Sequence, residues 1–268
     1  KGKIFGFHRS MDTLGAVLGP LLALLYLWFH PEEYKTLFLA AFIPGLFAVI
    51  SSLFLKGKKQ KNEKPQSKIS FFSFLRYWNE SPAAYKKLVL GLLVFTLFNS
   101  SDVFLLLKAK EAGLSDTSVI GVYIFYNLIY ALFAFPLGML ADKIGLKTIF
   151  VAGIGVFSVV YLGMAFNTNL IIFLALFFLY GIYAAATEGI SKAWISNITA
   201  KKDMATAIGT YSGLQSVCAM LASSFAGIIW FRFGAMATFL LTAVVSLLVA
   251  LYFAIRIPGF SHVNDDRS

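Results

Sequence analysis

The chain has 268 residues, of which 59% are hydrophobic and only 13% charged, and its mean hydropathy is +0.77. Soluble domains are about half apolar and a quarter charged, so this composition excludes an ordinary soluble domain. The net charge of +10 does not indicate a nucleic-acid-binding protein, because the basic residues lie in short segments between apolar runs. With three histidines and one cysteine, the sequence predicts neither a metal site nor another cofactor.

Apolar runs of about twenty residues, enough to cross a hydrocarbon core of roughly 30 Å, recur along the chain. In lipid a helix satisfies its own backbone hydrogen bonds, and the alternating pattern of a membrane β-barrel is absent. The sequence therefore predicts an all-α polytopic membrane protein. Its eight expected spans cover residues 10–29, 35–55, 87–107, 117–140, 147–166, 169–195, 204–230 and 234–256.

The first span contains the sequence G-A-V-L-G-P, which includes Gly15, Gly19 and Pro20. The two glycines leave one helix face without side chains, so another helix can approach closely there. Pro20 removes a backbone donor and is expected to bend the helix. Arg9 and Asp12 share a face at the start of this span, which predicts a local ion pair or helix cap, with a ligand site as the alternative.

A long polar segment follows the second span and begins K-G-K-K-Q-K-N-E-K. It is too charged to pack, and we predict a cytoplasmic linker over residues 57–86. Its last part, F-F-S-F-L-R-Y-W, predicts an amphipathic helix on the membrane surface. With this linker in the cytoplasm, all but four of the 23 lysines and arginines lie on cytoplasmic segments, so both termini, including the tail 258–268, are expected there.

The third span carries the polar sequence N-S-S-D, which ends at Asp102. An ionisable group inside a membrane helix is costly and indicates a functional site. Asn99 and Asp102 stand three residues apart, so we expect them on one helix face, presenting an amide and a carboxylate to one cavity. The alternative is that Asp102 lies near the outer end and pairs with Lys108.

The fourth span carries a polar and aromatic stripe at helical spacing, formed by Tyr123, Tyr126, Asn127 and Tyr130. Such a stripe can line a central cavity and stack on an amphipathic substrate. It can equally form a hydrogen-bonded helix interface, and the sequence favours neither interpretation.

The sixth span contains Glu188 and Lys192, which face each other at i, i+4. A buried carboxylate beside an ammonium group has a protonation state that depends on its burial and its partner, as a proton relay requires. We therefore predict that this pair handles protons or substrate. The alternative is a static pair that fixes the helix register or latches the cytoplasmic gate.

Residues 138–147 read G-M-L-A-D-K-I-G-L-K and connect two apolar runs. This spacing resembles the signature loop after the second and eighth helices of major facilitator superfamily transporters, although Leu146 replaces the family's usual second basic residue. A tight turn rich in glycine and lysine is the alternative. By this resemblance the gating loop comprises Gly138, Asp142, Lys143, Gly145 and Lys147.

The resemblance also implies the contacts of this loop. Gly138 would let the eighth helix pack against the eleventh, and Asp142 would meet the positive N-terminal end of the eleventh helix near residues 206–210. Lys143 and Lys147 would hold the cytoplasmic side shut.

The resemblance further implies a twelve-helix fold with two pseudo-symmetric six-helix halves, in which the eight spans are helices five to twelve. Helices five and six would lie in residues 1–56 and the C-terminal half in 87–257, and four further spans would precede Lys1. A weak similarity between residues 6–21 and 209–224 agrees with parallel halves. The G-x-x-x-G-P sequence of the first span also resembles a motif in the fifth helix of drug–proton antiporters, although Ala23 and Leu24 replace its final glycine pair.

These features together predict a monomeric secondary active transporter in the inner membrane of a bacterium. Its partners would be the lipid bilayer, a small organic solute and protons, and it would export the solute by alternating access. Uptake of sugars or organic anions, or a non-transporting sensor or scaffold of the same fold, are the alternatives. An enzyme is not expected, because H-E-x-x-H, G-x-S-x-G and nucleotide-binding motifs are absent.

Overall fold

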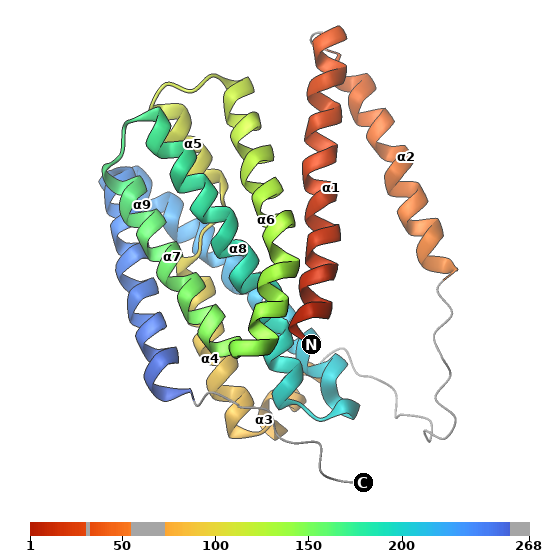
Figure 1. Cartoon of the computed structure of the whole chain (residues 1–268), viewed down its shortest axis with the longest axis vertical. Helices are drawn as coiled ribbons and strands as arrows, with labels where there is room; N and C mark the ends of the chain where they lie inside the picture. Colours follow the sequence, from red (N-terminus) through yellow and green to blue (C-terminus); the bar gives the residue numbers. More distant parts are fainter. Residues whose placement is uncertain (31–32, 55–72, 258–268) are drawn as a thin grey trace.

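The computed structural model describes residues 1–30, 33–54 and 73–257, and the regular elements in these ranges are all helical. Figure 1 shows a bundle of α4 to α9, with α1 along one side of it and α2 further out. The elements are α1 (Gly2–Phe29), α2 (Tyr34–Leu53), α3 (Ser73–Glu80), α4 (Ala83–Phe98), α5 (Val103–Glu111), α6 (Asp116–Ile144), α7 (Leu146–Phe166), α8 (Leu170–Ile198), the 3₁₀ turn η1 (Lys201–Asp203) and α9 (Met204–Arg256).

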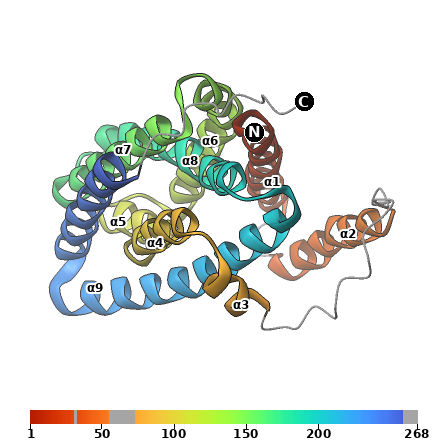
Figure 2. The ribbon, with the colours of Figure 1, turned by 90° about the horizontal axis from the view of Figure 1, so that it is seen from below.

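The described residues contain seven helical stretches that are long and apolar enough to cross a membrane. The last of them, Lys201–Arg256, is divided by Gly234, whose φ of 82° lies in the left-handed region that favours glycine. The chain reverses at this residue, and the second part of α9 returns beside α7 (Figures 1 and 2). The predicted all-α polytopic fold is therefore confirmed, and its eight spans are all present.

The central helix of the bundle is α8, which contacts α1, α4, α6, α7 and α9. Lipid supplies no hydrophobic force that draws apolar helices together, so close packing of small residues holds them. Gly153 of α7 illustrates this, since a Cβ atom there would lie 2.8 Å from the Cβ of Ala186. The run of alanines in α8 thus serves the helix contacts of the bundle.

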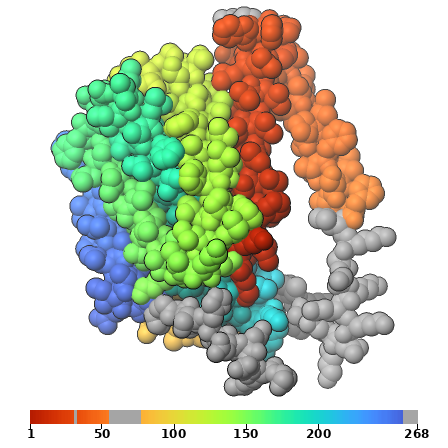
Figure 3. All heavy atoms as spheres, viewed as in Figure 1, coloured from red at the N-terminus to blue at the C-terminus, as the bar shows by residue number. Residues whose placement is uncertain are grey.

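The two helices that precede the bundle differ in how they are held. α1 contacts both α6 and α8, whereas no residue of α2 is buried. Figure 3 shows α2 standing apart from the body, on the far side of α1. α1 is therefore the element through which the first part of the chain joins the bundle.

Three glycines bring α1 and α6 into backbone contact. A Cβ atom on Gly6 would lie 2.5 Å from the carbonyl oxygen of Ala134, and one on Gly138 would lie 2.5 Å from that of Gly2. Gly138 was predicted to pack against the eleventh helix, the first part of α9, and this prediction is wrong. The helix that packs against Gly138, and would clash with a side chain there, is α1.

The predicted close approach at Gly15 and Gly19 is also wrong for the part of the chain that the structure describes. A Cβ atom at either position would meet nothing within 4 Å, because these residues face away from α6 and α8. Pro20 lies inside α1, and the helix continues past it. The G-x-x-x-G pair that packs against α6 is Gly2 and Gly6, which lie about one turn apart at the start of α1.

Most of the predicted linker and the whole tail fall on residues 55–72 and 258–268, outside the described ranges. The helix predicted at the end of the linker is present as α3, which contacts α9. Tyr77 and Trp78 of α3 pack edge-to-face against Tyr85 of α4. Its place on a membrane surface stays a prediction.

The glycine contact can be tested by adding one methyl group. We expect Gly6→Ala to destabilise the protein by about 1–3 kcal/mol, because the methyl group would overlap the Ala134 carbonyl oxygen. Gly15→Ala adds the same methyl group to an open face of the same helix, so its effect should stay within about 0.5 kcal/mol. Thermal unfolding of the detergent-solubilised protein measures both. Equal melting temperatures for the two variants would contradict the proposed contact.

Candidate functional site

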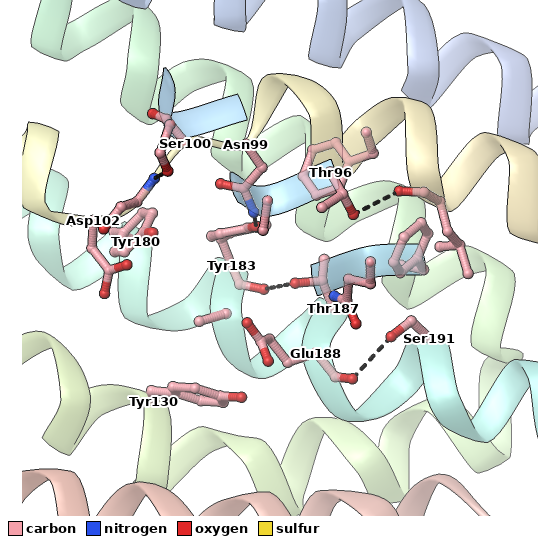
Figure 4. Close-up of a pocket in the computed structure, with 18 of the residues that line it drawn as sticks. Thr96, Asn99, Ser100, Asp102, Tyr130, Tyr180, Tyr183, Thr187, Glu188 and Ser191 are labelled. Carbon is pink, nitrogen blue, oxygen red and sulfur yellow. Dashed lines mark hydrogen bonds between the residues drawn. The ribbon is translucent and has the colours of Figure 1, made fainter. Parts of the chain in front are cut away.

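A cavity of about 280 Å³ lies between α4, α6, α8 and the first part of α9. Figure 4 shows Tyr130 of α6 facing the stretch of α8 that carries Tyr183, Thr187 and Glu188. The lining combines aromatic rings with polar groups and two carboxylates. Its polar residues are Thr96, Asn99, Ser100, Ser101, Asp102, Tyr130, Tyr180, Tyr183, Thr187, Glu188, Ser191, Tyr211, Gln215 and Ser223.

The third membrane span is broken where it reaches this cavity. α4 ends at Phe98 and α5 begins at Val103, so Asn99 and Asp102 do not share a helix face, and that prediction is wrong. Asparagine, serine and aspartate compete with helical hydrogen bonds, which accounts for the break at N-S-S-D. Both residues still line the cavity, as expected.

Hydrogen bonds to neighbouring helices hold the broken segment in place. The Asn99 Nδ2 donates to the hydroxyl of Tyr183 on α8, at 2.8 Å. The backbone amide of Ser101 donates to Oγ of Ser223 on α9, at 3.2 Å. Non-helical backbone at membrane depth needs such partners, because lipid offers none.

Asp102 is held by Tyr126 of α6, whose hydroxyl donates to its Oδ2. The alternative pairing with Lys108 is not found, and Lys110 instead pairs with Asp116 at 2.6 Å. No lysine, arginine or histidine nitrogen of the described residues lies within 4.0 Å of the Asp102 carboxylate. Asp102 therefore has no basic partner among the described residues.

The stripe on α6 combines the two interpretations that its sequence allowed. Tyr130 is buried and lines the cavity, whereas Tyr126 reaches the cavity only through Asp102. Asn127 is buried, and its Nδ2 donates to the Tyr123 carbonyl one turn back on the same helix, at 2.9 Å. Only part of the stripe faces a possible substrate.

Glu188 is paired with Arg9 of α1, and not with Lys192 as predicted. The same guanidinium donates to Oδ2 of Asp12 at 2.9 Å, which confirms the predicted local pair at the start of the first span. α1 comes this close because it crosses α8 at Gly189, where a Cβ atom would lie 3.3 Å from the Phe5 backbone. The guanidinium group of an arginine can bind two carboxylates at once. The spacing of residues along the sequence gave no sign of the contact between Arg9 and Glu188.

The carboxylate of Asp142 lies at the N-terminal end of α1. It accepts hydrogen bonds from the backbone amides of Gly2, at 2.7 Å, and Lys3, at 2.8 Å. The expected kind of contact is therefore present, a carboxylate on the free amides of a first helical turn, but the predicted partner helix is wrong. α6 packs on α1, and this places Asp142 at the start of the fifth helix of the expected fold, not the eleventh.

The remaining loop residues act within the bundle. Gly145 is the single residue between α6 and α7, and its φ of 103° makes this tight turn possible. Nζ of Lys147 donates to the carbonyls of Ala254, at 2.8 Å, and Ile257, at 2.6 Å, at the end of α9. Lys147 thus links the start of α7 to the end of α9, and its role in holding the cytoplasmic side shut stays a prediction. Lys143 is exposed.

We expect Asp142→Asn to lower the free energy of unfolding by about 1 kcal/mol, because it removes a charge from the positive end of α1. Lys143→Gln, the neighbouring change of charge on an exposed side chain, should have little effect. Thermal unfolding in detergent at low and high salt separates the two. If Lys143→Gln lowers the melting temperature as much as Asp142→Asn, the loss reflects the charge of the loop and not a contact with α1.

Two comparisons with known proteins agree with this architecture. Residues 88–267 match the family model of the Major Facilitator Superfamily. Over 256 residues, 93% of its length, the chain is 32% identical to an uncharacterized MFS-type transporter of Methanocaldococcus jannaschii. The chain spans 63% of the length of this relative. The chain therefore belongs to the Major Facilitator Superfamily.

Proposed function

We propose that the protein is a secondary active transporter of small organic solutes that works by alternating access. In this scheme residues 1–56 contain the last two helices of one six-helix half, and residues 87–257 form the other half. Residues 57–86 are the linker between the two halves. The observation that carries the proposal is the ion pair between Arg9 and Glu188. It links a helix of one proposed half to a helix of the other at the wall of the cavity.

The contacts of α1 with α6 and α8 form the proposed gate. Besides the glycine contacts and Asp142, the Nζ of Lys1 donates to the carbonyl of Ser196 near the end of α8, at 2.7 Å. Ser10 donates to the carbonyl of Ala131 on α6, at 2.5 Å. These contacts join the two proposed halves toward the end of the bundle where α1 begins, which we term the basic end. Opening of the cavity toward this end would break them.

Proton coupling is proposed to act through Glu188. Protonation would remove the charge that holds Arg9, so proton binding and the separation of α1 from α8 would be thermodynamically linked. The other titratable groups around this carboxyl are Asp12 of α1, Tyr183 and Lys192 of α8, Tyr130 of α6 and Tyr211 of α9. Glu188 lies about 15 Å from the end of α8, deep enough to belong to the pathway of the solute.

The proposed direction of transport and the proposed orientation in the membrane are supported by features of the sequence. The resemblance of Gly15, Gly19 and Pro20 to an antiporter motif supports export, and the distribution of lysine and arginine supports a cytoplasmic basic end with both termini there. We further propose a monomer in a bacterial inner membrane. Uptake of sugars or organic anions, and a non-transporting sensor, remain the competing functions.

The coupling proposal predicts that Glu188→Gln, in the complete protein as it is encoded, abolishes transport driven by a pH gradient. Exchange of labelled for unlabelled solute needs no net proton movement, so it should continue at a measurable rate. Both rates are measured in proteoliposomes with a solute found by screening organic cations, sugars and organic anions. Glu111→Gln at the end of α5, outside the cavity, is the matched control and should transport normally.

A static latch predicts a different outcome. Driven transport and exchange would then fall together in Glu188→Gln, and the charge swap Arg9→Glu with Glu188→Arg would restore both. Normal driven transport by Glu188→Gln would remove Glu188 from the coupling mechanism. The absence of flux for all screened solutes would favour the sensor or scaffold.

A further inference from the structure

The charges that line the cavity are all negative in the described part of the chain. Asp102 and Glu188 carry carboxylates, and no lysine, arginine or histidine lines the cavity. Arg9 compensates Glu188 from outside the lining, whereas Asp102 has no basic partner among the described residues. A charge held without a partner inside a membrane protein is costly, so a ligand of opposite charge that supplies the partner would bind favourably.

The carboxylate of Asp102 is turned away from its own helix. Asp102 is the N-cap residue of α5, yet it makes no side-chain capping bond to the amides of that helix. Its Oδ2 accepts from Tyr126, and its Oδ1 accepts no hydrogen bond from the residues that the structure describes. One oxygen is thus oriented by Tyr126, and the other remains available to a donor in the cavity that Asp102 lines.

A second free acceptor lies on the same broken segment. Oδ1 of Asn99 is buried and has no hydrogen-bond partner, because the amide group uses its nitrogen to bind Tyr183. The segment lies between the C-terminal end of α4, where the helix dipole is negative, and the N-terminal end of α5, where it is positive, so the two helix ends oppose each other. The two acceptor oxygens, one of them on a carboxylate, favour a group that offers several N–H donors and a positive charge.

The rest of the cavity suits an apolar or aromatic body. Tyr130, Tyr180 and Tyr183 line it, and tyrosine rings attract cations as well as packing against apolar groups. Its volume of about 280 Å³ lies just below the roughly 300–1,000 Å³ of pockets for drug-sized ligands. The solute should therefore be small.

We propose that the cavity binds a small organic cation whose ammonium group lies between Asp102 and Asn99 Oδ1, with its apolar part against the tyrosines. The proposal names the substrate class of the transporter and rests on the proposed function for its role in transport, although binding itself can be measured separately. Organic anions would face an uncompensated carboxylate, and sugars would leave its charge unpaired. Tyr126 acts as a positioning residue, since it contacts the carboxylate and not the solute.

The test compares a cation with its uncharged analogue, using 2-phenylethylammonium and 2-phenylethanol as probes. Thermal stabilisation of the purified protein by each probe reports binding to the folded state without any transport. We expect the cation alone to stabilise the wild-type protein. Asp102→Asn should weaken binding of the cation about tenfold or more. Asp116→Asn, the same change at the exposed partner of Lys110, should leave binding unchanged.

Tyr126→Phe provides a second variant in case Asp102→Asn folds poorly. It keeps the carboxylate but removes its orienting bond, so binding of the cation should weaken less than in Asp102→Asn while 2-phenylethanol still fails to bind. Equal binding of the two probes, or unchanged binding of the cation by a folded Asp102→Asn, would overturn the proposal. Stabilisation by sodium ions that depends on Asp102, without any by the amine, would also overturn it in favour of an inorganic cation site.

The outcome is distinguishable from that of the coupling experiment. If the cation binds through Asp102 but no pH-driven flux occurs, the proposed function fails and the binding site stands. If flux is coupled through Glu188 but the cation does not bind, the transporter stands and the substrate class is wrong.

Discussion

The backbone contact between α1 and α6 is the constraint on which the other contacts of α1 depend. Gly6 and Gly138 have no side chains to separate the two helices, so the backbones meet. Only at this separation can Asp142 reach the first amides of α1, and only then does Arg9 come within reach of Glu188 on α8. A short-range steric feature thus determines two electrostatic contacts on different helices.

The second constraint is the cost of polar groups in a membrane. The N-S-S-D segment cannot continue a regular helix, and lipid offers no partners to the backbone groups that it frees. The hydroxyl of Ser223 accepts from the backbone amide of Ser101, and the hydroxyls of Tyr183 and Tyr126 bind the side chains of Asn99 and Asp102, so three other helices hold the segment. The break therefore stands where the bundle is polar inside, and the cavity and the broken helix are consequences of the same local sequence.

The two carboxylates of the cavity differ in a way that matters for their proposed roles. Glu188 has its counter-charge on α1, which lies across the proposed interface between halves, so a change in its charge acts on that interface. Asp102 lies within the bundle and has only a neutral phenol as partner among the described residues. One carboxylate is thus suited to couple a proton to a conformational change, and the other to bind a cation.

The sequence by itself determined the membrane class, the all-α fold, the positions of the eight spans and four of the residues that line the cavity. Apolar run length and the cost of buried charge act locally, so each can be read without knowing which helices are neighbours. They identified Asn99, Asp102, Tyr130 and Glu188 as residues that meet a cavity.

Only the tertiary structure decided the partners. Spacing along one helix suggested Lys192 for Glu188, but packing brought Arg9 from a residue far away in the chain. Likewise, a positive helix end was expected for Asp142, and the helix that supplied it was α1 because Gly138 of α6 lies against that helix. Local periodicity says which face a residue occupies, whereas its contacts depend on which helices come close enough to pack, and this is a property of the whole bundle.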